Sequence, residues 1–312
     1  MTNFKNAMLV GLTMAASQAW AQAALTADQA ERCATRLSIA LTGRSPATAL
    51  MSNPNPQAET NTLVNSADFQ ERFARFVNAS FNDDPGATAV EDSAYYMARY
   101  VLQNNLKWED MFIGQYSVTQ GTGTPTPPPA VVADPNGLGF FRSPAWLLRY
   151  AGNEEAGIKI NTAFRLMNNT IGLRLVPSTN SPGADISATG RTAAGCRACH
   201  YDSWFALDKV ASILTIKRTD AQGRVTFGPK PAASADVLGQ TGVVDDKDLV
   251  TRLVKSEAFE FRACRLAFEF LYGRSELTCE GPIFDRCMTA FKADGKIQSA
   301  IAAVAQDATF CQ

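Results

Sequence analysis

The chain has 312 residues, with 29 basic and 30 acidic side chains, a formal net charge of −1 and 46% apolar residues. This apolar content is ordinary for a globular protein. The balanced charge and the lack of a basic block argue against a nucleic-acid partner. Beyond the N-terminus no segment reaches 18 uninterrupted apolar residues, so we expect no membrane span.

Residues 1–23 have the layout of a secretory signal peptide. Lys5 gives a basic start, and an apolar stretch follows over residues 7–16. A small-residue cleavage pattern comes next, either Ala19-Trp20-Ala21 or Ala21-Gln22-Ala23. We therefore expect an exported protein with a periplasmic or extracellular location.

Residues 24–118 form a predicted N-terminal helical region. A first helix is expected from a Thr26 cap to a stop at Gly43, and another begins at a Ser66 cap. Their apolar positions recur at helical spacing, which predicts one buried face on each helix.

Residues 119–137 are rich in Thr, Pro and Gly and predict an extended surface loop or a linker. The second helical region covers residues 138–312. It includes a helix with apolar positions at Ile160, Phe164, Met167 and Ile171, and a hairpin around Ala221-Gln222-Gly223. We expect a mostly α fold with long loops and at most a small hairpin.

The chain has seven cysteines, which in an exported protein indicate an oxidising compartment. Cys279 and Cys287 flank a Gly-Pro turn, and this proximity predicts a disulfide between them. A second disulfide is expected within the set Cys33, Cys264 and Cys311.

The stretch Cys196-Arg197-Ala198-Cys199-His200 contains the only histidine in the chain. Cys-x-x-Cys-His is the attachment sequence of c-type haem. The two thiols add to the two vinyl groups of the macrocycle, and the adjacent imidazole becomes the proximal iron ligand. We therefore expect one covalently attached haem c, with links through Cys196 and Cys199 and with His200 on the iron.

Three other interpretations of this stretch compete with haem attachment. A redox disulfide would need a thioredoxin-like strand and helix, which the flanking sequence does not predict. A zinc site would need a fourth ligand, and neither a second Cys-x-x-Cys nor a histidine pair is present. A structural disulfide would not explain why the single histidine directly follows the second cysteine.

The iron ligand opposite His200 cannot be a second imidazole from this chain. Methionine is the usual complement for electron transfer, and Met167 precedes the motif on a predicted helix. Packing in the core is the common alternative for such a methionine. An open distal position, or a tyrosine or lysine ligand, also stays possible.

Several neighbours of the motif are candidates for haem contacts. Arg191 and Arg197 would pair with the propionates, and Tyr201 and Trp204 would pack on the macrocycle. The alternatives are solvated arginines and ordinary core aromatics.

The motif and its flanks resemble the planctomycete-type cytochrome c-like proteins. In that family Cys-x-x-Cys-His is followed by a segment ending in Gly-Phe-Ala-Leu-Glu, which here reads Trp204-Phe205-Ala206-Leu207-Asp208. Helical stretches near both ends of the chain, "RLSIALTGRSP" and "DLVTRLVKSEAFEFRACRLAFEFLYGR", are also similar. The Asp-Pro that follows the motif in the family is replaced by Tyr201-Asp202-Ser203. The resemblance implies an exported haem protein of c-type cytochrome-like fold and little about a substrate.

These observations predict an exported monohaem c-type cytochrome that relays electrons between redox partner proteins. One alternative is a haem enzyme with an open distal site, either peroxidase-like or a small-molecule oxidoreductase. Another is a haem-bearing subunit of a larger assembly. The sequence leaves the reduction potential, the redox partner and the oligomeric state open.

Overall fold

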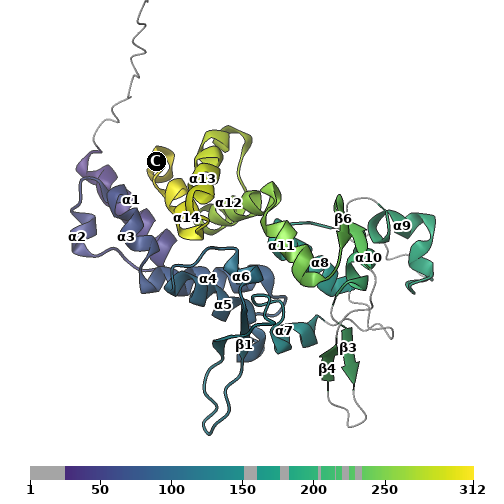
Figure 1. Cartoon of the computed structure of the whole chain (residues 1–312). Helices are drawn as coiled ribbons and strands as arrows, with labels where there is room; N and C mark the ends of the chain where they lie inside the picture. Colours follow the sequence, from purple (N-terminus) through teal and green to yellow (C-terminus); the bar gives the residue numbers. More distant parts are fainter. Residues whose placement is uncertain are drawn as a thin grey trace, which may run out of the picture.

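The computed structural model describes residues 25–150, 160–175, 183–202, 205–214, 216–219, 225–228 and 234–312. The predicted signal peptide and Trp204 lie outside these described residues. The described chain is mostly helical, which confirms the predicted fold class (Figure 1). Its α-helices are α1 Ala27–Thr42, α2 Thr48–Met51, α3 Thr60–Val64, α4 Ala67–Phe81, α5 Ser93–Gln103, α6 Asp110–Ile113, α7 Pro144–Arg149, α8 Ile160–Ile171, α9 Ala194–His200, α10 Leu207–Ser212, α11 Asp246–Val254, α12 Glu257–Tyr272, α13 Gly281–Asp294 and α14 Ile297–Ala305. Short 3₁₀ turns are η1 Pro56–Glu59, η2 Ala89–Glu91, η3 Gly190–Thr192, η4 Thr278–Glu280 and η5 Ala308–Cys311.

The helix boundaries follow the predicted capping signals. The Thr26 side chain accepts a hydrogen bond from the backbone N–H of Gln29, and the Gln29 side chain accepts one from the N–H of Thr26. Helix α1 ends at Gly43, whose φ of 70° lies in the left-handed region that glycine adopts without strain. The hydroxyl of Ser66 caps α4 by accepting from the N–H of Phe69.

The described residues contain three two-stranded antiparallel hairpins, so the expectation of at most one was wrong. They are β1 Tyr116–Thr119 with β2 Ala130–Ala133, β3 Ile216–Thr219 with β4 Val225–Gly228, and β5 Ala235–Val237 with β6 Gln240–Val243. The pair β3–β4 is the predicted hairpin, although its turn lies outside the described residues. The β5–β6 turn was missed because Leu238 and Gly239, both at positive φ, form a tight turn without the usual Asn-Gly signal.

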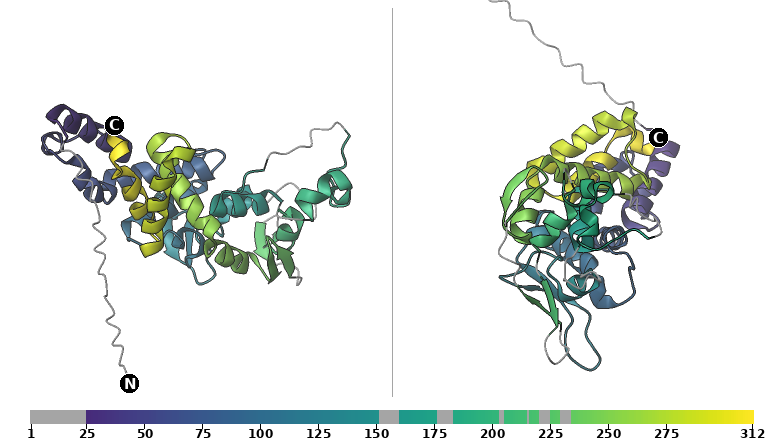
Figure 2. Two further views of the ribbon diagram at one scale, coloured as in Figure 1. Left: turned by 90° about the horizontal axis from the view of Figure 1, so that it is seen from above. Right: turned by 90° about the vertical axis from the view of Figure 1, so that its right-hand side faces the viewer.

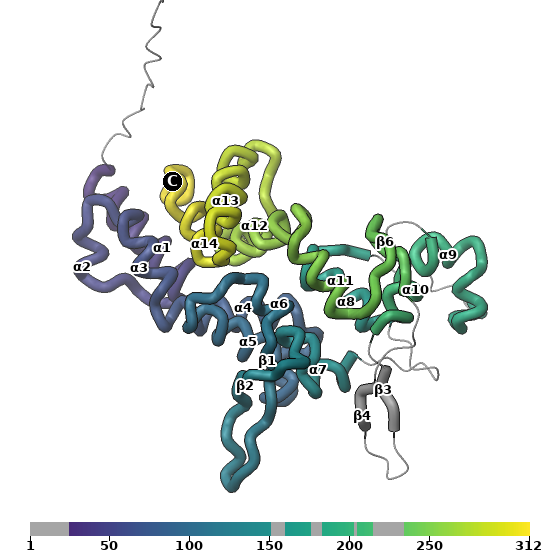
Figure 3. The backbone as a smooth tube through the Cα atoms, viewed as in Figure 1, coloured from purple at the N-terminus to yellow at the C-terminus, as the bar shows by residue number. Residues whose placement is uncertain are grey.

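The Thr- and Pro-rich segment extends from the body of the protein as the arm formed by β1 and β2 (Figure 3). Immediately after it, the side chains of Leu138, Phe140 and Phe141 return to the core and are buried. Helices on both sides of the segment therefore share one core, and the segment is a loop on that core.

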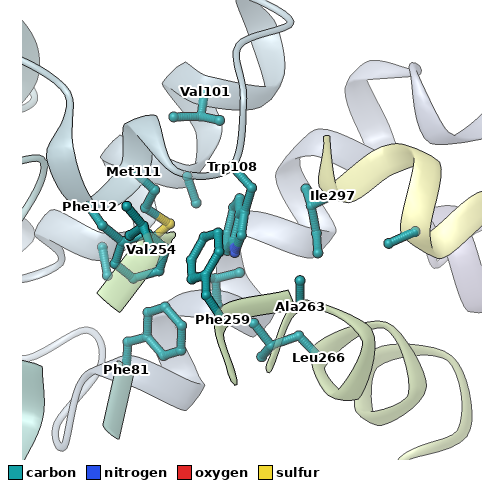
Figure 4. Close-up of a cluster of buried hydrophobic side chains, with 14 of the residues drawn as sticks. Phe81, Val101, Trp108, Met111, Phe112, Val254, Phe259, Ala263, Leu266 and Ile297 are labelled. Carbon is teal, nitrogen blue, oxygen red and sulfur yellow. The ribbon is translucent and has the colours of Figure 1, made fainter. Parts of the chain in front are cut away.

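A cluster of buried hydrophobic side chains in the core includes the aromatic rings of Phe81, Trp108, Phe112 and Phe259 (Figure 4). Phe112 of α6 packs edge-to-face on Phe259 of α12, with ring centroids 5.5 Å apart. The backbone N–H of Trp108 donates to the carbonyl of Gly295 at 2.8 Å. The middle of the chain is thus joined to its C-terminal helices.

The described part of the chain is elongated, as Figure 1 and the left view of Figure 2 show. Helix α1 and the turn η5 meet at one end, where Cys33 is bonded to Cys311. Helix α9 lies at the opposite end, beyond α8 and α10 (Figures 1 and 2). No helix within the described ranges is long and apolar enough to cross a bilayer.

Candidate haem site

The motif residues share one short helix, α9, at the end of the molecule opposite α1 (Figure 1). Cys196, Cys199 and His200 all belong to α9, whose neighbours are η3 and α10. Positions three apart lie on the same side of a helix, so the two thiols are held as a pair. Cys196 is half-buried and Cys199 is exposed.

Cys196, Cys199 and Cys279 are the three cysteines with free thiols. The other four form the disulfides Cys33–Cys311 and Cys264–Cys287. The predicted bond between Cys279 and Cys287 was therefore wrong. The packing of α12 on α13 brings the α-carbons of Cys264 and Cys287 to 5.9 Å, whereas Cys279 is exposed on η4. The expected second bond within the set Cys33, Cys264 and Cys311 is present as Cys33–Cys311.

The imidazole of His200 is oriented by a carboxylate. Its Nδ1 lies 2.7 Å from Oδ2 of Asp208, which is the second residue of α10. An ionised carboxylate only accepts hydrogen bonds, so this contact places the ring proton on Nδ1. In the neutral imidazole the lone pair is then on Nε2, the nitrogen that remains for a metal.

Asp208 is itself held by Arg191 of η3. The guanidinium donates to both carboxylate oxygens, with its shortest contact at 2.8 Å, and also donates to the carbonyl of Ile186. The side chains of Asp208 and Arg191 are only 4% and 10% exposed. Arg191 is a candidate for pairing with a haem propionate. In the structure its partner is the Asp208 carboxylate, which also contacts His200.

The turn before α10 sets the position of Asp208. Ala206 is buried and has φ 37° and ψ 45°, a left-handed conformation that costs a non-glycine residue about 1–2 kcal/mol. Leu207, Val210 and Ala211 anchor α10 in the core against α8. Asp208 therefore lies in the first turn of a helix that is anchored in the core, two residues after the strained Ala206.

A close backbone approach fixes the segment before α9. A β-carbon on Gly190 would lie 2.1 Å from the carbonyl oxygen of Asp185, so the contact requires glycine. Hydrogen bonds from the hydroxyl and the N–H of Ser187 lower the pKa of the Asp185 carboxyl below its usual value. The loop is thereby closed onto η3, which carries Arg191.

The structure also describes Arg197, Tyr201 and Met167, whose predicted contacts with haem stay predictions. Arg197 is exposed and its Nε donates to Asp202 at 2.7 Å, as the solvated alternative expects. The hydroxyl of Tyr201 donates to the carbonyl of Ala188. Met167 is fully buried on α8, as the core alternative expects, and its role as an iron ligand stays a prediction.

Asp208 is the site residue that sequence reasoning missed. It was quoted only as the last residue of a family-like segment. An acidic residue eight positions after the single histidine is a weak signal, because the αL turn at Ala206 decides where it points. Within the described ranges no group of three or more His, Cys, Asp or Glu side chains is arranged to hold a metal ion.

Comparison of the chain with known protein families, with curated proteins and with solved structures gave no match.

Proposed function

We propose that the protein is an exported monohaem c-type cytochrome, with haem c attached through Cys196 and Cys199 and with His200 as proximal ligand. The main support is the 2.7 Å contact between Nδ1 of His200 and the carboxylate of Asp208, which in the neutral imidazole leaves the lone pair on Nε2. The two motif thiols are free in a protein that contains two disulfides, which agrees with their use in thioether links.

Haem supplies a one-electron couple whose potential depends on the axial ligands and on hydrogen bonding. The residues of this chain hold and orient the proximal base. Cys196 and Cys199 would attach the macrocycle to α9 at two positions. Asp208 fixes the rotation of the His200 ring through its contact with Nδ1. Every residue of α9 is exposed or half-exposed, which allows a redox partner protein to approach.

The location supports electron transfer outside the cytoplasm. Two disulfides form and persist in oxidising compartments, and the attachment chemistry of c-type haem takes place after export. The N-terminal layout of residues 1–23 supplies the export signal in this proposal.

Haem attachment is tested by expressing the full chain in a host competent for cytochrome maturation. The wild-type protein should gain the mass of one haem and keep its colour under denaturing conditions. Replacing both thiols, Cys196→Ser with Cys199→Ser, should abolish the gain in mass. The control Cys279→Ser removes the other free thiol and should leave attachment unchanged. A colourless wild-type protein with the mass of its amino acids alone would disprove the proposal.

The burial of Met167 favours one alternative, a haem enzyme with an open distal position, because a side chain packed in the core is less available to iron. Optical spectra with and without carbon monoxide separate the two functions. Electron relay with methionine ligation predicts a weak far-red band in the oxidised protein, lost in Met167→Leu. Rapid carbon monoxide binding would instead support the enzyme.

A further inference from the structure

The partner of His200 is an anion, and that choice has an electronic consequence. A hydrogen bond to a neutral carbonyl would orient the ring equally well. A carboxylate at 2.7 Å draws the Nδ1 proton more strongly and increases the electron density on Nε2. Electron-rich nitrogen stabilises ferric iron more than ferrous iron, so it lowers the reduction potential.

Resting on the haem attachment proposed above, we infer that Asp208 is a positioning residue that lowers the reduction potential of the haem. It acts through His200 and does not bind the iron. The inference depends on its burial, because water would screen an exposed carboxylate. The Asp208 side chain is 4% exposed, and both of its oxygens accept from Arg191.

Arg191 has the opposite effect on the same carboxylate. Its guanidinium neutralises part of the Asp208 charge, so it limits how strongly the carboxylate draws the His200 proton. Together the two residues give the His200 nitrogen an intermediate electron-donating strength toward iron. Asp208 lowers the reduction potential of the haem, and Arg191 raises it.

The structure around Asp208 indicates that its carboxylate does more than stabilise the fold. A buried ion pair contributes little net stability, because desolvation offsets the attraction between its charges. The chain nevertheless adopts a left-handed conformation at Ala206 immediately before Asp208. Backbone strain concentrates at functional sites, so its presence beside this ion pair supports a role for Asp208 beyond stability.

The test measures midpoint potentials by optical redox titration of the full, haem-loaded protein. Asp208→Asn keeps an acceptor for Nδ1–H and removes the charge. It should favour ferrous over ferric iron about tenfold, a rise of about 59 mV for a one-electron couple. Arg191→Gln should lower the potential. Asp208→Glu keeps the charge and should stay closer to the wild-type value than Asp208→Asn.

Asp202→Asn is the matched control. Asp202 lies near the motif and pairs with Arg197, but both side chains are about half exposed. Its charge is screened by solvent, so its removal should leave the potential within experimental error of the wild type.

Opposite shifts in Asp208→Asn and Arg191→Gln support the inference. Equal-sign shifts in both variants would mean that the pair only maintains the structure, and an unchanged potential in haem-loaded Asp208→Asn would overturn the electronic role. Should Asp208→Asn fail to accumulate, the midpoint potentials of Asp208→Glu and Arg191→Gln are compared with that of the wild type instead. An unchanged potential in Arg191→Gln would then overturn the inference. A wild-type protein without haem would refute the proposed function itself, which distinguishes the two failures.

Discussion

At the residue scale, the motif depends on contacts made before and after it in the chain. Gly190 allows the loop carrying Asp185 to approach η3, and η3 places Arg191 on Asp208. Asp208 then orients His200. A small change at Gly190 should therefore reach the imidazole through two ion-paired side chains.

Gly190→Ala is expected to loosen this end of the molecule. The added β-carbon meets a backbone carbonyl at 2.1 Å, which cannot move as a side-chain end would, and such overpacking costs about 1–3 kcal/mol. Amide hydrogen exchange should increase over residues 185–200, and the fraction of exported protein carrying haem should fall.

The control for this prediction is Gly195→Ala in the same segment. Nothing lies within 4 Å of a β-carbon at Gly195, and alanine is favoured over glycine in a helix by about 1 kcal/mol. Exchange in α9 should slow and the haem content should stay at the wild-type level. Equal exchange and haem content in both variants would show that the Gly190 contact is unimportant.

The sequence predicts the candidate site residues that are recognised by their spacing, but it does not predict the carboxylate that the fold places beside them. Cys196, Cys199 and His200 are adjacent in sequence, so their pattern is visible without a structure. The partner of His200 depends on the turn at Ala206 and on the packing of α10. Neither follows from residue type or spacing.

At the element scale, helix ends were predictable and helix surroundings were not. The caps at Thr26 and Ser66 are local hydrogen bonds and stand where the sequence placed them. On α8 the periodicity predicted a face that includes Ile160, which is only partly buried, whereas polar Asn169 and Thr170 are fully buried. Helix α8 is covered by α10, α11 and α12, and this packing decides burial.

The β1–β2 arm gives an element-scale prediction. Residues 122–128 at its tip are exposed, whereas the strands pair from Tyr116 opposite Ala133 to Thr119 opposite Ala130. Replacing residues 121–128 with a four-residue Gly-Ser linker should change the free energy of unfolding by less than about 1 kcal/mol, because loop-closure entropy varies slowly with loop length.

Urea denaturation of the shortened and wild-type proteins measures this change. As a control, Gly139→Ala places a β-carbon 1.9 Å from the carbonyl of Met111 at the base of the arm and should destabilise strongly. A large loss of stability on shortening would mean that the tip itself packs on the protein.

At the scale of the whole molecule, disulfide pairing follows from tertiary packing. The pair Cys33–Cys311 spans 278 positions and joins α1 to the last turn, where Arg36 also donates to the carbonyl of Gln312. The pair Cys264–Cys287 spans 23 positions between neighbouring helices. Sequence proximity favoured Cys279 instead, because the packing of α12 on α13 cannot be deduced from spacing.

The two disulfides should differ in their effect on stability. In the chain-entropy model, closing the long loop restricts the unfolded state by about 5.6 kcal/mol and closing the short loop by about 3.4 kcal/mol. Removing Cys33–Cys311 with paired alanines should therefore lower the free energy of unfolding more than removing Cys264–Cys287. Urea denaturation of both double variants gives the comparison.

Because α9 lies at the opposite end of the molecule, haem content should be unchanged when Cys33–Cys311 is removed. A greater loss from the short loop would show that native packing around Cys264 outweighs chain entropy.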